Sequence, residues 1–468
     1  MWNFNRYPNK ICAITEDGEE FTYSSLSAFC DEMKQYLPPR TLVFCLCSNT
    51  YASMAGYVSF LKNKVVPLML DAHIDTELLD NFLRLYRPQY IWAPAQTAER
   101  FNEKPVFEAY GYSLVSLNED APFPLHDDLA LLLTTSGSTG SPKLVRQSYK
   151  NIEANTASIV EYLNIDDTER AITTLPMNYT YGLSIVNTHL DAGAAVILTS
   201  KTLMQREFWE QFDKFGATSF GGVPYTYEIL DKLRFFRRDV PTLRTMTQAG
   251  GKLSPELHKK FAEYAAQSGR KFVVMYGQTE ATARMGWLPA QNSLEKAGSM
   301  GIAIPGGKFT LIDTQENEIT APDTVGELVY EGDNVTLGYA EKGEDLIKGD
   351  ERNGRLVTGD MAKFDDDGFF YIVGRKKRFL KIFGNRVNLD ETERLIKSHF
   401  NGLDCACTGR DDRMDIFVTN EDDIKDVKAF IAEKSRLNPT AFRVSYLEKI
   451  PKNEAGKTLY AALEKINE

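Results

Sequence analysis

The sequence predicts an α/β fold in which a large N-terminal domain of parallel sheets with helices precedes a small α+β C-terminal domain. Through most of the first 300 residues, apolar runs of strand length alternate with segments whose apolar residues recur at helical spacing. This alternation favours parallel sheets covered by helices. From Gly301 to Tyr371 the chain is rich in Gly, Asp and short alternating stretches, which indicate antiparallel β structure with tight turns. A basic cluster, Arg375 to Arg378, then precedes a shorter α/β stretch.

The individual elements follow from these patterns. The predicted strands are Leu42–Leu46, Val65–Leu70, Tyr90–Trp92, Leu129–Thr134, Ala171–Leu175, Ala195–Leu198, Phe272–Met275, Phe309–Ile312 and Gly326–Tyr330. The predicted helices include Tyr51–Leu61, Ile152–Leu163 and Leu459–Ile466. The boundary lies near Lys377, so we expect an N-terminal domain of residues 1–376 and a C-terminal domain of residues 377–468. The β-rich part of the first domain covers about 301–374.

Composition and charge narrow the class of protein. The net charge is −11, from 54 basic and 65 acidic side chains, which opposes nonspecific attachment to nucleic acid or anionic lipid. The N-terminus lacks the apolar core of a secretion signal, and no apolar run approaches the roughly 18 residues of a membrane span. We therefore expect a cytoplasmic globular protein with no nucleic-acid partner and no membrane span.

The cysteine spacing argues for thiols in the core. Cys45-Leu46-Cys47 and Cys405-Ala406-Cys407 would each place two thiols on one face of a strand. Neither has the CxxC spacing of a zinc site, and no histidine cluster accompanies them. Buried reduced cysteines are therefore favoured over a metal site.

The sharpest local feature runs from Leu131 to Lys143, where a buried strand leads into small and hydroxylated residues and then a lysine. A loop that wraps a triphosphate needs glycines for close backbone approach, hydroxyl and amide donors, and a cation. The candidate phosphate-binding residues are Thr135, Ser136, Gly137, Ser138, Thr139, Gly140 and Lys143. The segment is not a Walker loop, because G-x-x-x-x-G-K-[ST] cannot be threaded through it. A flexible Ser/Gly turn is the alternative.

This segment resembles the phosphate loop of the adenylate-forming (AMP-binding) superfamily, which includes acyl- and aryl-CoA synthetases, luciferases and the adenylation domains of peptide synthetases. Tyr276-Gly277-Gln278-Thr279-Glu280 is similar to the YGxTE element of that family. The resemblance implies that Tyr276 packs on adenine beside Gly277, that Thr279 contacts phosphate and that Glu280 holds Mg²⁺. The pair Gly250-Gly251 is a weaker match to the family pattern, and it implies that Gly251 belongs to the nucleotide site.

Three further motifs follow in the family order. Thr358-Gly359-Asp360 resembles the element whose aspartate binds ribose. Gly374 to Gly384 resembles the GRxKxxIKxxG hinge, which implies that Arg375 contacts ribose and that Lys377 is the hinge residue. The family usually has an acidic residue where this chain has Arg378.

The last motif, Pro451 to Lys457, resembles the PxxxxGK element. Its lysine, Lys457 here, would reach the substrate carboxylate and the α-phosphate. The family fold also implies that the β-rich region is a distorted β-barrel and that the small domain carrying Lys457 is mobile.

The acid-binding pocket is predicted from a variant motif. Pro176 to Gly182 is similar to P-x-F-H-x-x-G of CoA ligases, with Tyr179 at the histidine position. Amino-acid-activating members carry an aspartate at the next position, where this chain has Thr180. Because a buried ammonium group needs a carboxylate partner, we expect an acid other than an α-amino acid. The candidate pocket walls are Tyr179, Tyr181, Phe220, Gly221 and Gly222.

The resemblance implies an ATP- and Mg²⁺-dependent enzyme that converts a carboxylic acid into an acyl-adenylate and pyrophosphate, with Lys457, Glu280 and Thr279 in catalytic roles. The thiol of coenzyme A, or of a separate carrier protein, would then take the acyl group as a thioester. Three alternatives stay open: an amino-acid adenylation enzyme that loads a carrier protein, an ADP-forming phosphotransferase, and a noncatalytic nucleotide-binding relative.

Overall fold

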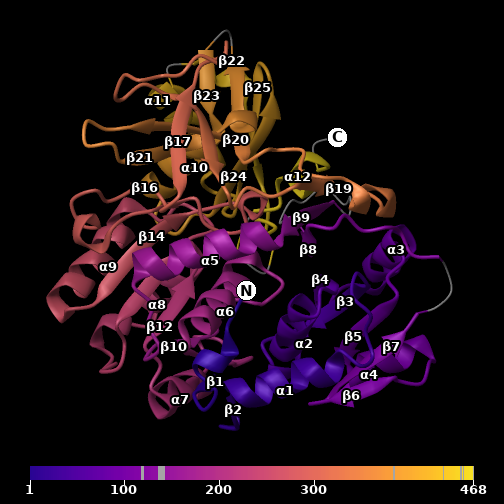
Figure 1. Cartoon of the computed structure of the whole chain (residues 1–468). Helices are drawn as coiled ribbons and strands as arrows, with labels where there is room; N and C mark the ends of the chain where they lie inside the picture. The colour runs from indigo at the N-terminus through magenta and orange to yellow at the C-terminus, as the bar shows by residue number, and fades with distance from the viewer. Residues whose placement is uncertain are drawn as a thin grey trace. The chain divides into compact units, whose positions relative to one another are not determined.

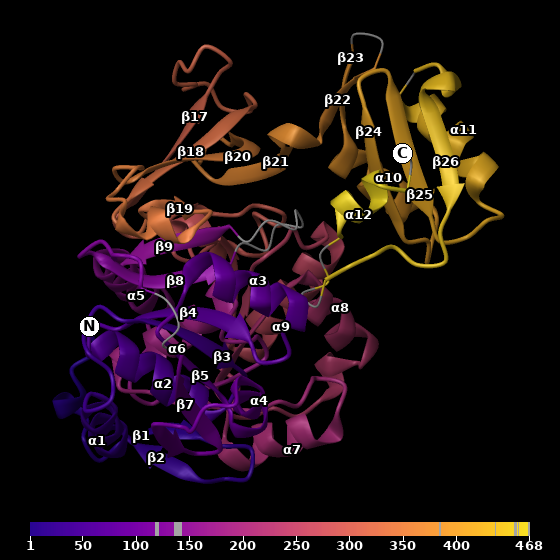
Figure 2. The same ribbon diagram turned by 90° about the vertical axis from the view of Figure 1, so that its right-hand side faces the viewer.

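The computed structural model of the chain describes residues 1–117, 121–134, 143–382, 385–435, 437–453, 456 and 458–466. These residues belong to two compact units (Figure 1 and Figure 2). The first unit contains the described residues of 1–134, 143–309 and 330–356, and the second contains those of 310–329 and 357–466.

One sheet of the first unit has eight strands. Their order across the sheet is β19 (Gly338–Ala340), β9 (Leu144–Ser148), β8 (Leu129–Thr134), β4 (Val66–Asp71), β3 (Leu42–Cys47), β5 (Tyr90–Pro94), β7 (Tyr112–Ser116) and β6 (Phe107–Ala109). The central pairs β3–β4, β3–β5 and β4–β8 are parallel. Every residue of β3 is buried, as expected for a parallel strand covered on both faces.

The other sheet of the first unit has nine strands. Their order is β16 (Ile302–Ala303), β15 (Gly286–Trp287), β14 (Lys271–Tyr276), β13 (Thr245–Gln248), β12 (Ser219–Gly222), β10 (Arg170–Ile172), β11 (Ala195–Ile197), β1 (Ile11–Ile14) and β2 (Glu20–Thr22). From β14 to β1 the neighbouring strands are parallel. The carboxyl ends of β12, β13 and β14 therefore meet at one edge, where ligands of open α/β sheets bind.

Helices cover and join the two sheets. They are α1 (Tyr23–Met33), α2 (Tyr51–Lys62), α3 (Thr76–Tyr86), α4 (Ala95–Ala98), α5 (Tyr149–Leu163), α6 (Thr180–Ala192), α7 (Arg206–Phe215), α8 (Pro224–Lys232) and α9 (Pro255–Ser268). Helix α5 packs on β8 and β9 of the eight-stranded sheet, α6 packs on β10 and β11 of the nine-stranded sheet, and the two helices contact each other (Figure 1). One hydrophobic core with residues from both sheets results, including Cys45, Met69, Leu131, Ala13 and Val196.

Local sequence signals set the helix ends. Ser148 caps α5, and its side chain and that of Asn151 each accept a backbone N–H of the other residue, as in a capping box. Ser254 caps α9, which has a proline in its first turn. That helix ends at Gly269, whose φ of +67° is the left-handed conformation that glycine adopts without strain.

Three small sheets lie wholly or largely in the second unit. A four-stranded sheet has the order β17 (Gly307–Ile312), β18 (Gly326–Gly332), β20 (Arg355–Phe364) and β21 (Phe370–Arg375). The pair β22 (Phe379–Ile382) and β23 (Asn385–Asn388) precedes the sheet of β24 (Cys405–Arg410), β25 (Arg413–Val418) and β26 (Phe442–Tyr446). The helices of this unit are α10 (Leu389–His399), α11 (Ile424–Ser435) and α12 (Tyr460–Glu464). Ile396, Ile416 and Val427 lie in its core.

The predicted α/β fold is confirmed, and most predicted strands lie within a residue or two of those observed. Leu129–Thr134 is β8, and the predicted helix Ile152–Leu163 lies inside α5. The prediction for Ala171–Leu175 was too long, because β10 ends at Ile172 and the chain leaves the sheet ahead of Pro176. All six cysteines are buried and form no disulfide. In the part of the chain that the structure describes, no helix is long and apolar enough to cross a membrane.

Candidate functional site at the strand ends of the first unit

The turn after β14 is built on close backbone packing. A Cβ atom at Gly277 would lie 1.6 Å from the carbonyl oxygen of Ala283, so no larger residue fits there. The chain returns at once, with the N–H of Met285 donating to the carbonyl of Tyr276 at 2.8 Å. The short 3₁₀ helix η4 (Thr279–Ala281) forms the tip of this turn and presents Glu280. The YGxTE element is therefore a rigid turn at the carboxyl edge of the sheet.

Hydrogen bonds to its backbone carbonyl fix the position of Glu280, so its carboxylate remains available to bind a ligand. Its carbonyl oxygen accepts from Nη1 of Arg352 at 3.0 Å and from Oγ1 of Thr336 at 2.9 Å. Its carboxylate oxygen Oε1 accepts from the hydroxyl of Tyr339 at 2.7 Å. Among the ion pairs of the described residues, none involves Glu280. A positioned carboxylate without a protein cation is a suitable ligand for a divalent metal ion that also contacts phosphates.

Tyr339 connects this carboxylate with the end of the phosphate loop. The ammonium nitrogen of Lys143 lies 3.6 Å from the centre of the Tyr339 ring, a cation–π distance. Burial, followed by the charge of Glu280, raises the pKa of Tyr339 to about 12, so its hydroxyl stays protonated and donates to Glu280. One tyrosine thus positions a cation on its ring face and an anion at its hydroxyl.

The predicted phosphate-binding residues Thr135 to Gly140 lie outside the described residues. The two strands on either side of them, β8 and β9, are antiparallel, with Thr134 opposite Leu144. Lys143 directly precedes β9, and its ammonium nitrogen lies 3.8 Å from a carboxylate oxygen of Glu341.

The neighbouring strand end carries the predicted Gly251. The side chain of Gln248, the last residue of β13, donates to the carbonyl of Gly251 at 2.9 Å. A Cβ atom at Gly251 would lie 3.1 Å from Pro224, at the start of α8. The preceding Gly250 has a φ of +83°, and a Cβ atom there would lie 2.6 Å from the hydroxyl of Tyr179. Gly251, just after β13, and Tyr276, the last residue of β14, therefore lie at the ends of adjacent parallel strands.

A cavity lies between helices α5 and α6 and strands β10, β12 and β13 of the nine-stranded sheet. Phe220 and Gly221, two of the predicted pocket walls, line it. A Cβ atom at Gly221 would lie 2.9 Å from the hydroxyl of Tyr181, so the glycine makes room for that ring. Gly222 faces away, towards Thr226 and Tyr227 of α8.

Thr180, the first residue of α6, has a structural contact at the turn. Its hydroxyl donates to the carbonyl of Thr282 at 2.9 Å, and the hydroxyl of Thr282 donates to the carbonyl of Asn334 at 2.7 Å. Thr282 has a φ of +64°, which is unusual and costly for a β-branched residue. These contacts fix the return of the chain after Glu280 in a strained conformation of the kind found at functional sites.

In the second unit, the structure brings Asp360 and Arg375 together. They are register partners on β20 and β21, with Nε of Arg375 3.1 Å from Oδ1 of Asp360. Asp360 is buried, whereas the Arg375 side chain is mostly exposed. The hydroxyl of Thr358 accepts the N–H of Asp360 at 3.1 Å and donates to the carbonyl of Leu328 at 2.8 Å. An exposed cation beside a positioned carboxylate is a suitable pair for two neighbouring sugar hydroxyls.

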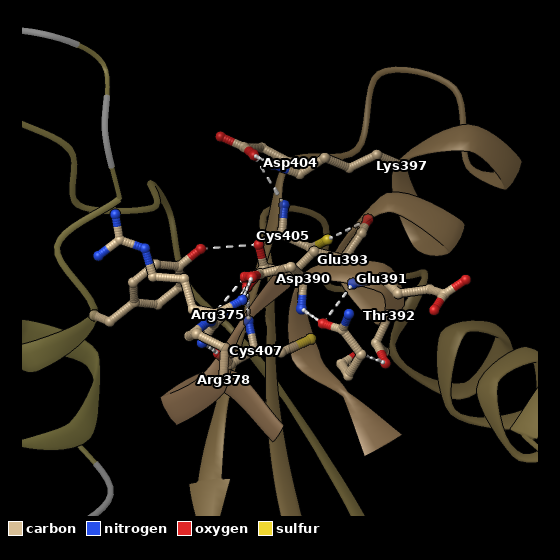
Figure 3. A network of polar contacts seen from close by, with 12 residues as sticks. Arg375, Arg378, Asp390, Glu391, Thr392, Glu393, Lys397, Asp404, Cys405 and Cys407 are labelled. Carbon is tan, nitrogen blue, oxygen red and sulfur yellow. Dashed lines mark hydrogen bonds and ion pairs between the residues drawn. The ribbon is translucent and has the colours of Figure 1, made fainter. Parts of the chain in front are cut away.

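The hinge motif begins at a glycine that the packing requires. A Cβ atom at Gly374 would lie 2.6 Å from Nδ2 of Asn388, which donates to the carbonyl of Val373. Lys377 lies in the 3₁₀ helix η7 (Lys376–Arg378), and its side chain lies outside the described part of the chain. Lys457 also lies outside the described residues. Figure 3 shows Arg378 within a network of carboxylates in the second unit.

The structure adds functional candidates that the sequence reasoning missed. Tyr339 and Arg352 lie next to Glu280 although they follow it by more than 50 residues, and no motif marks either one. Arg284 lies only four residues after Glu280 and lines the cavity. An arginine four residues beyond the glutamate of the YGxTE element was the available signal.

The comparisons with known proteins agree with this fold. The fold is that of adenylate-forming enzymes: the structure superposes on O-succinylbenzoate coenzyme A synthetase from Bacillus subtilis in complex with AMP with a TM-score of 0.80, at 20% identity, over 99% of this chain and 98% of that one. The same synthetase in complex with ATP and magnesium ion gives a TM-score of 0.77, also at 20% identity, over 98% of this chain and 97% of that one. The family model described as AMP-binding enzyme matches residues 1–340, so this chain belongs to the AMP-binding enzyme family.

Curated relatives extend the comparison. Peroxisomal OPC-8:0-CoA ligase 1 of Arabidopsis thaliana is 30% identical over 73% of this chain and 64% of its own length. Long-chain-fatty-acid–CoA ligase of Bacillus subtilis is 29% identical over 72% of this chain and 61% of its own length. The chain therefore spans less than two thirds of the length of these relatives.

Proposed function

We propose that this chain is an AMP-forming acid–CoA ligase. It activates a carboxylic acid with ATP to give an acyl-adenylate and pyrophosphate, and then transfers the acyl group to the thiol of coenzyme A. The family membership and the named CoA ligases among its relatives support this proposal. The observation that carries it is the Glu280 carboxylate, which accepts from the hydroxyl of Tyr339 while the ammonium group of Lys143 lies over the ring of the same tyrosine.

The chemistry explains the residue types. A carboxylate is a poor electrophile, because attack on it would have to expel an oxide. In the first step a carboxylate oxygen of the acid attacks the α-phosphorus, an acyl–phosphate bond forms, and the bond to pyrophosphate breaks. In the second step the thiol attacks the acyl carbon, AMP leaves, and the thiol proton is released to solvent. The first step brings two anions together, so it depends on local positive charge and on positioning.

We assign the charges as follows. Lys143, with residues Thr135 to Gly140, would bind the β- and γ-phosphates, and Lys457 would contact the reacting carboxylate and α-phosphate. Thr279 would donate to a phosphate oxygen, and Tyr276 would pack on adenine between Gly251 and Gly277. Asp360 would accept hydrogen bonds from the ribose hydroxyls beside Arg375. These roles follow the family resemblance, and the described contacts of Lys143, Asp360 and Arg375 support their part of it.

The Glu280 site also fits the Mg²⁺ ion that the family requires. No group of three or more His, Cys, Asp or Glu side chains among the described residues forms a metal cage. Mg²⁺ in ATP-dependent enzymes is usually held by only one or two carboxylates together with substrate phosphates. Bound there, the ion would neutralise phosphate charge.

The experiment is acid-dependent exchange of pyrophosphate into ATP, with hydroxylamine trapping of the adenylate and identification of the nucleotide product. Wild type should release AMP and pyrophosphate, and Glu280→Gln and Lys457→Ala should each lose about 10²-fold or more in rate, as for other single electrostatic groups. Glu263→Gln, on the exposed face of α9, is the matched control. ADP as the product would instead identify a phosphotransferase, and nucleotide binding without turnover would identify a noncatalytic relative.

Separate reactions identify the thiol acceptor and the acid substrate. The trapped acid is offered to coenzyme A and to a holo carrier protein in parallel reactions. Thioester formation only on the carrier protein would replace coenzyme A as the proposed acceptor. Thr180, where amino-acid-activating enzymes have an aspartate, is engaged with Thr282, so no carboxylate stands there for an ammonium group. An α-amino acid as the best substrate would contradict this part of the proposal.

A further inference from the structure

The cavity between the nine-stranded sheet and helices α5 and α6 is lined by one arginine, Arg284, which forms no ion pair among the described residues. Its volume is about 40 Å³. Since about 10–15 Å³ on this scale holds one water molecule, the cavity has room for a short chain of a few heavy atoms. Apolar side chains of α5 and α6, among them Ile159 and Ile185, form much of its wall. Arg284 forms another part of the wall.

Arg284 is 3% exposed, yet its described neighbours are aromatic rings and a thioether. Its Nε donates to Sδ of Met275 at 3.2 Å, and its guanidinium carbon lies 3.9 Å from the centre of the Tyr181 ring. Burial raises the pKa of the neighbouring Tyr162, and the charge of Arg284 opposes that rise. Among the described residues, no carboxylate forms an ion pair with Arg284. Stacking on a ring leaves the N–H groups at the guanidinium edge available in its plane.

Arg146, a second buried arginine of the same unit, has the contacts expected of a structural residue. Arg146 is fully buried, and it forms an ion pair with Glu351. Its remaining N–H groups donate to backbone carbonyls, including those of Tyr339 and Leu337. Burying a cation is costly unless it is paired and hydrogen-bonded, and Arg146 meets that condition within the protein. Among the described residues, Arg284 has no such carboxylate partner, so a bound anion would fulfil the condition.

The other ionisable groups of the cavity wall do not supply that anion. Glu169 is engaged by the hydroxyl of Thr218 and lies 3.5 Å from Nη1 of Arg244. His189 is buried, and burial lowers its pKa, so the ring is neutral. Its Nδ1 lies 2.8 Å from the carbonyl oxygen of Ile185, which can only accept, so Nδ1 carries the proton. Nε2 is then an acceptor, and it has no hydrogen-bond partner among the described residues. Among the described residues that line the cavity, Arg284 is therefore the one cation, and the one carboxylate, Glu169, is held by Thr218 and Arg244.

We infer that the acid activated by this chain carries a second carboxylate, and that Arg284 binds this distal group. The inference rests on the proposed function, because it assigns the cavity to the tail of the acid. A planar guanidinium recognises a carboxylate with two parallel hydrogen bonds, which gives both affinity and orientation. The small volume restricts the acid to a short chain between the two carboxylates. Arg284 is thus a specificity-determining residue, and its charge also disfavours substrates with an ammonium group.

The test compares matched acids on the wild-type enzyme by hydroxylamine-trapped adenylation. The pairs are malonate with propionate, succinate with butyrate, and glutarate with valerate. Monomethyl succinate keeps the length of succinate and removes the distal charge. We expect at least one dicarboxylate to exceed its partner in kcat/KM by about 10- to 100-fold, the usual range for a hydrogen-bonded charge pair. This comparison uses only the wild-type enzyme, so it tests the inference even if a substitution at Arg284 impairs folding.

The variant arm uses Arg284→Met, Arg284→Lys and the exposed control Arg206→Met. Arg284→Met should remove the preference for the dicarboxylate while keeping turnover of the monocarboxylate, and Arg284→Lys should restore part of the preference. A loss of packing alone would lower turnover of both acids equally and would overturn the inference. Wild-type preference for the uncharged tail would overturn it as well, while leaving the proposed adenylation intact. Absence of adenylation with every acid would instead refute the proposed function.

Discussion

The guanidinium of Arg378 is bound to Asp390 inside the second unit, with Nε 2.8 Å from Oδ1 (Figure 3). Arg378 also pairs with Glu393, donates to the carbonyl of Cys407, and lies 3.8 Å from the centre of the Tyr460 ring. The residue that replaces the usual acidic neighbour of the hinge lysine is therefore an anchor to α10 and β24. On the other side of the hinge, Nζ of Lys376 lies 2.6 Å from a carboxylate oxygen of Glu327 on β18. Lys377 stands between two anchored neighbours.

Loss of the Arg378 side chain should destabilise the C-terminal part of the second unit. Burial raises the pKa of Glu393, and the charge of Arg378 opposes that rise, so Arg378→Met leaves a buried acid without its cation. Removing one partner of a buried pair costs about 3–5 kcal/mol. The measurement is amide hydrogen exchange of β24 and β25, because all four tryptophans lie in the first unit and would not report on this change. The matched control Arg394→Met breaks only an exposed pair with Glu391 and should change protection by less than about 0.5 kcal/mol.

The position of Lys377 predicts a separation of the two half-reactions. Proline fixes φ and removes an N–H, so Lys377→Pro should restrict rotation at the residue that we propose as the hinge between residues 1–376 and 377–468. Adenylate formation should be spared, and thioester formation should fall by about tenfold or more. Single-turnover measurements of each step give the comparison, with Lys377→Ala as the control that keeps backbone freedom. Equal loss of both steps would contradict a hinge role for Lys377.

Tyr339 should matter for the use of MgATP. Tyr339→Phe removes the hydroxyl that donates to Glu280, and hydrogen bonds to charged groups typically account for about 10-fold or more in affinity. We expect a rise in KM for MgATP in pyrophosphate exchange. Tyr339→Leu also removes the ring under Lys143 and should have the larger effect. The exposed Tyr446→Phe is the control. An unchanged KM in both Tyr339 variants would show that the contact has no role in binding nucleotide.

A buried histidine predicts a stability loss in mild acid. The N–H of Gly298 donates to Nδ1 of His258, and Nε2 faces Ser293 at 3.0 Å, so the ring is neutral with its proton on Nε2. Burial lowers the pKa of His258 from 6.5 to about 4. Between these values the unfolded chain binds the extra proton, so the contribution to stability is present above pH 6.5 and is lost as the pH falls towards 4.

This group alone should lower the free energy of unfolding of the first unit by about 2 kcal/mol between pH 7 and pH 5. Urea unfolding followed by tryptophan fluorescence measures it as the difference between wild type and His258→Gln. The variant should be less stable at pH 7 but less sensitive to acid. His73→Gln, at an exposed histidine, should keep the wild-type pH dependence. An equal slope in wild type and His258→Gln would refute the assignment.

Much of the architecture was accessible from the sequence because its signals are local. The apolar run at Leu129–Thr134 and the helical spacing of Ile152–Leu163 depend on residues close in the chain, and both elements were found at those places. The glycines of the motifs also marked positions of close packing. Gly277 and Gly374 stand where a neighbouring backbone or side chain leaves no space for a Cβ atom. Asp360 and Arg375, which the family resemblance assigned separately to ribose, lie beside each other in the structure.

The sequence by itself determined the class of this protein, since the ordered motifs from Thr134 to Lys457 and the alternation of apolar runs are written in the chain. Only the tertiary structure decided which side chains share an environment. Tyr339 reaches Glu280 across 59 positions, and Arg284 is buried against Tyr181 without a carboxylate among the described residues. The reason is physical: a charge acquires its role from burial and from its partners, and both arise only when distant segments pack together.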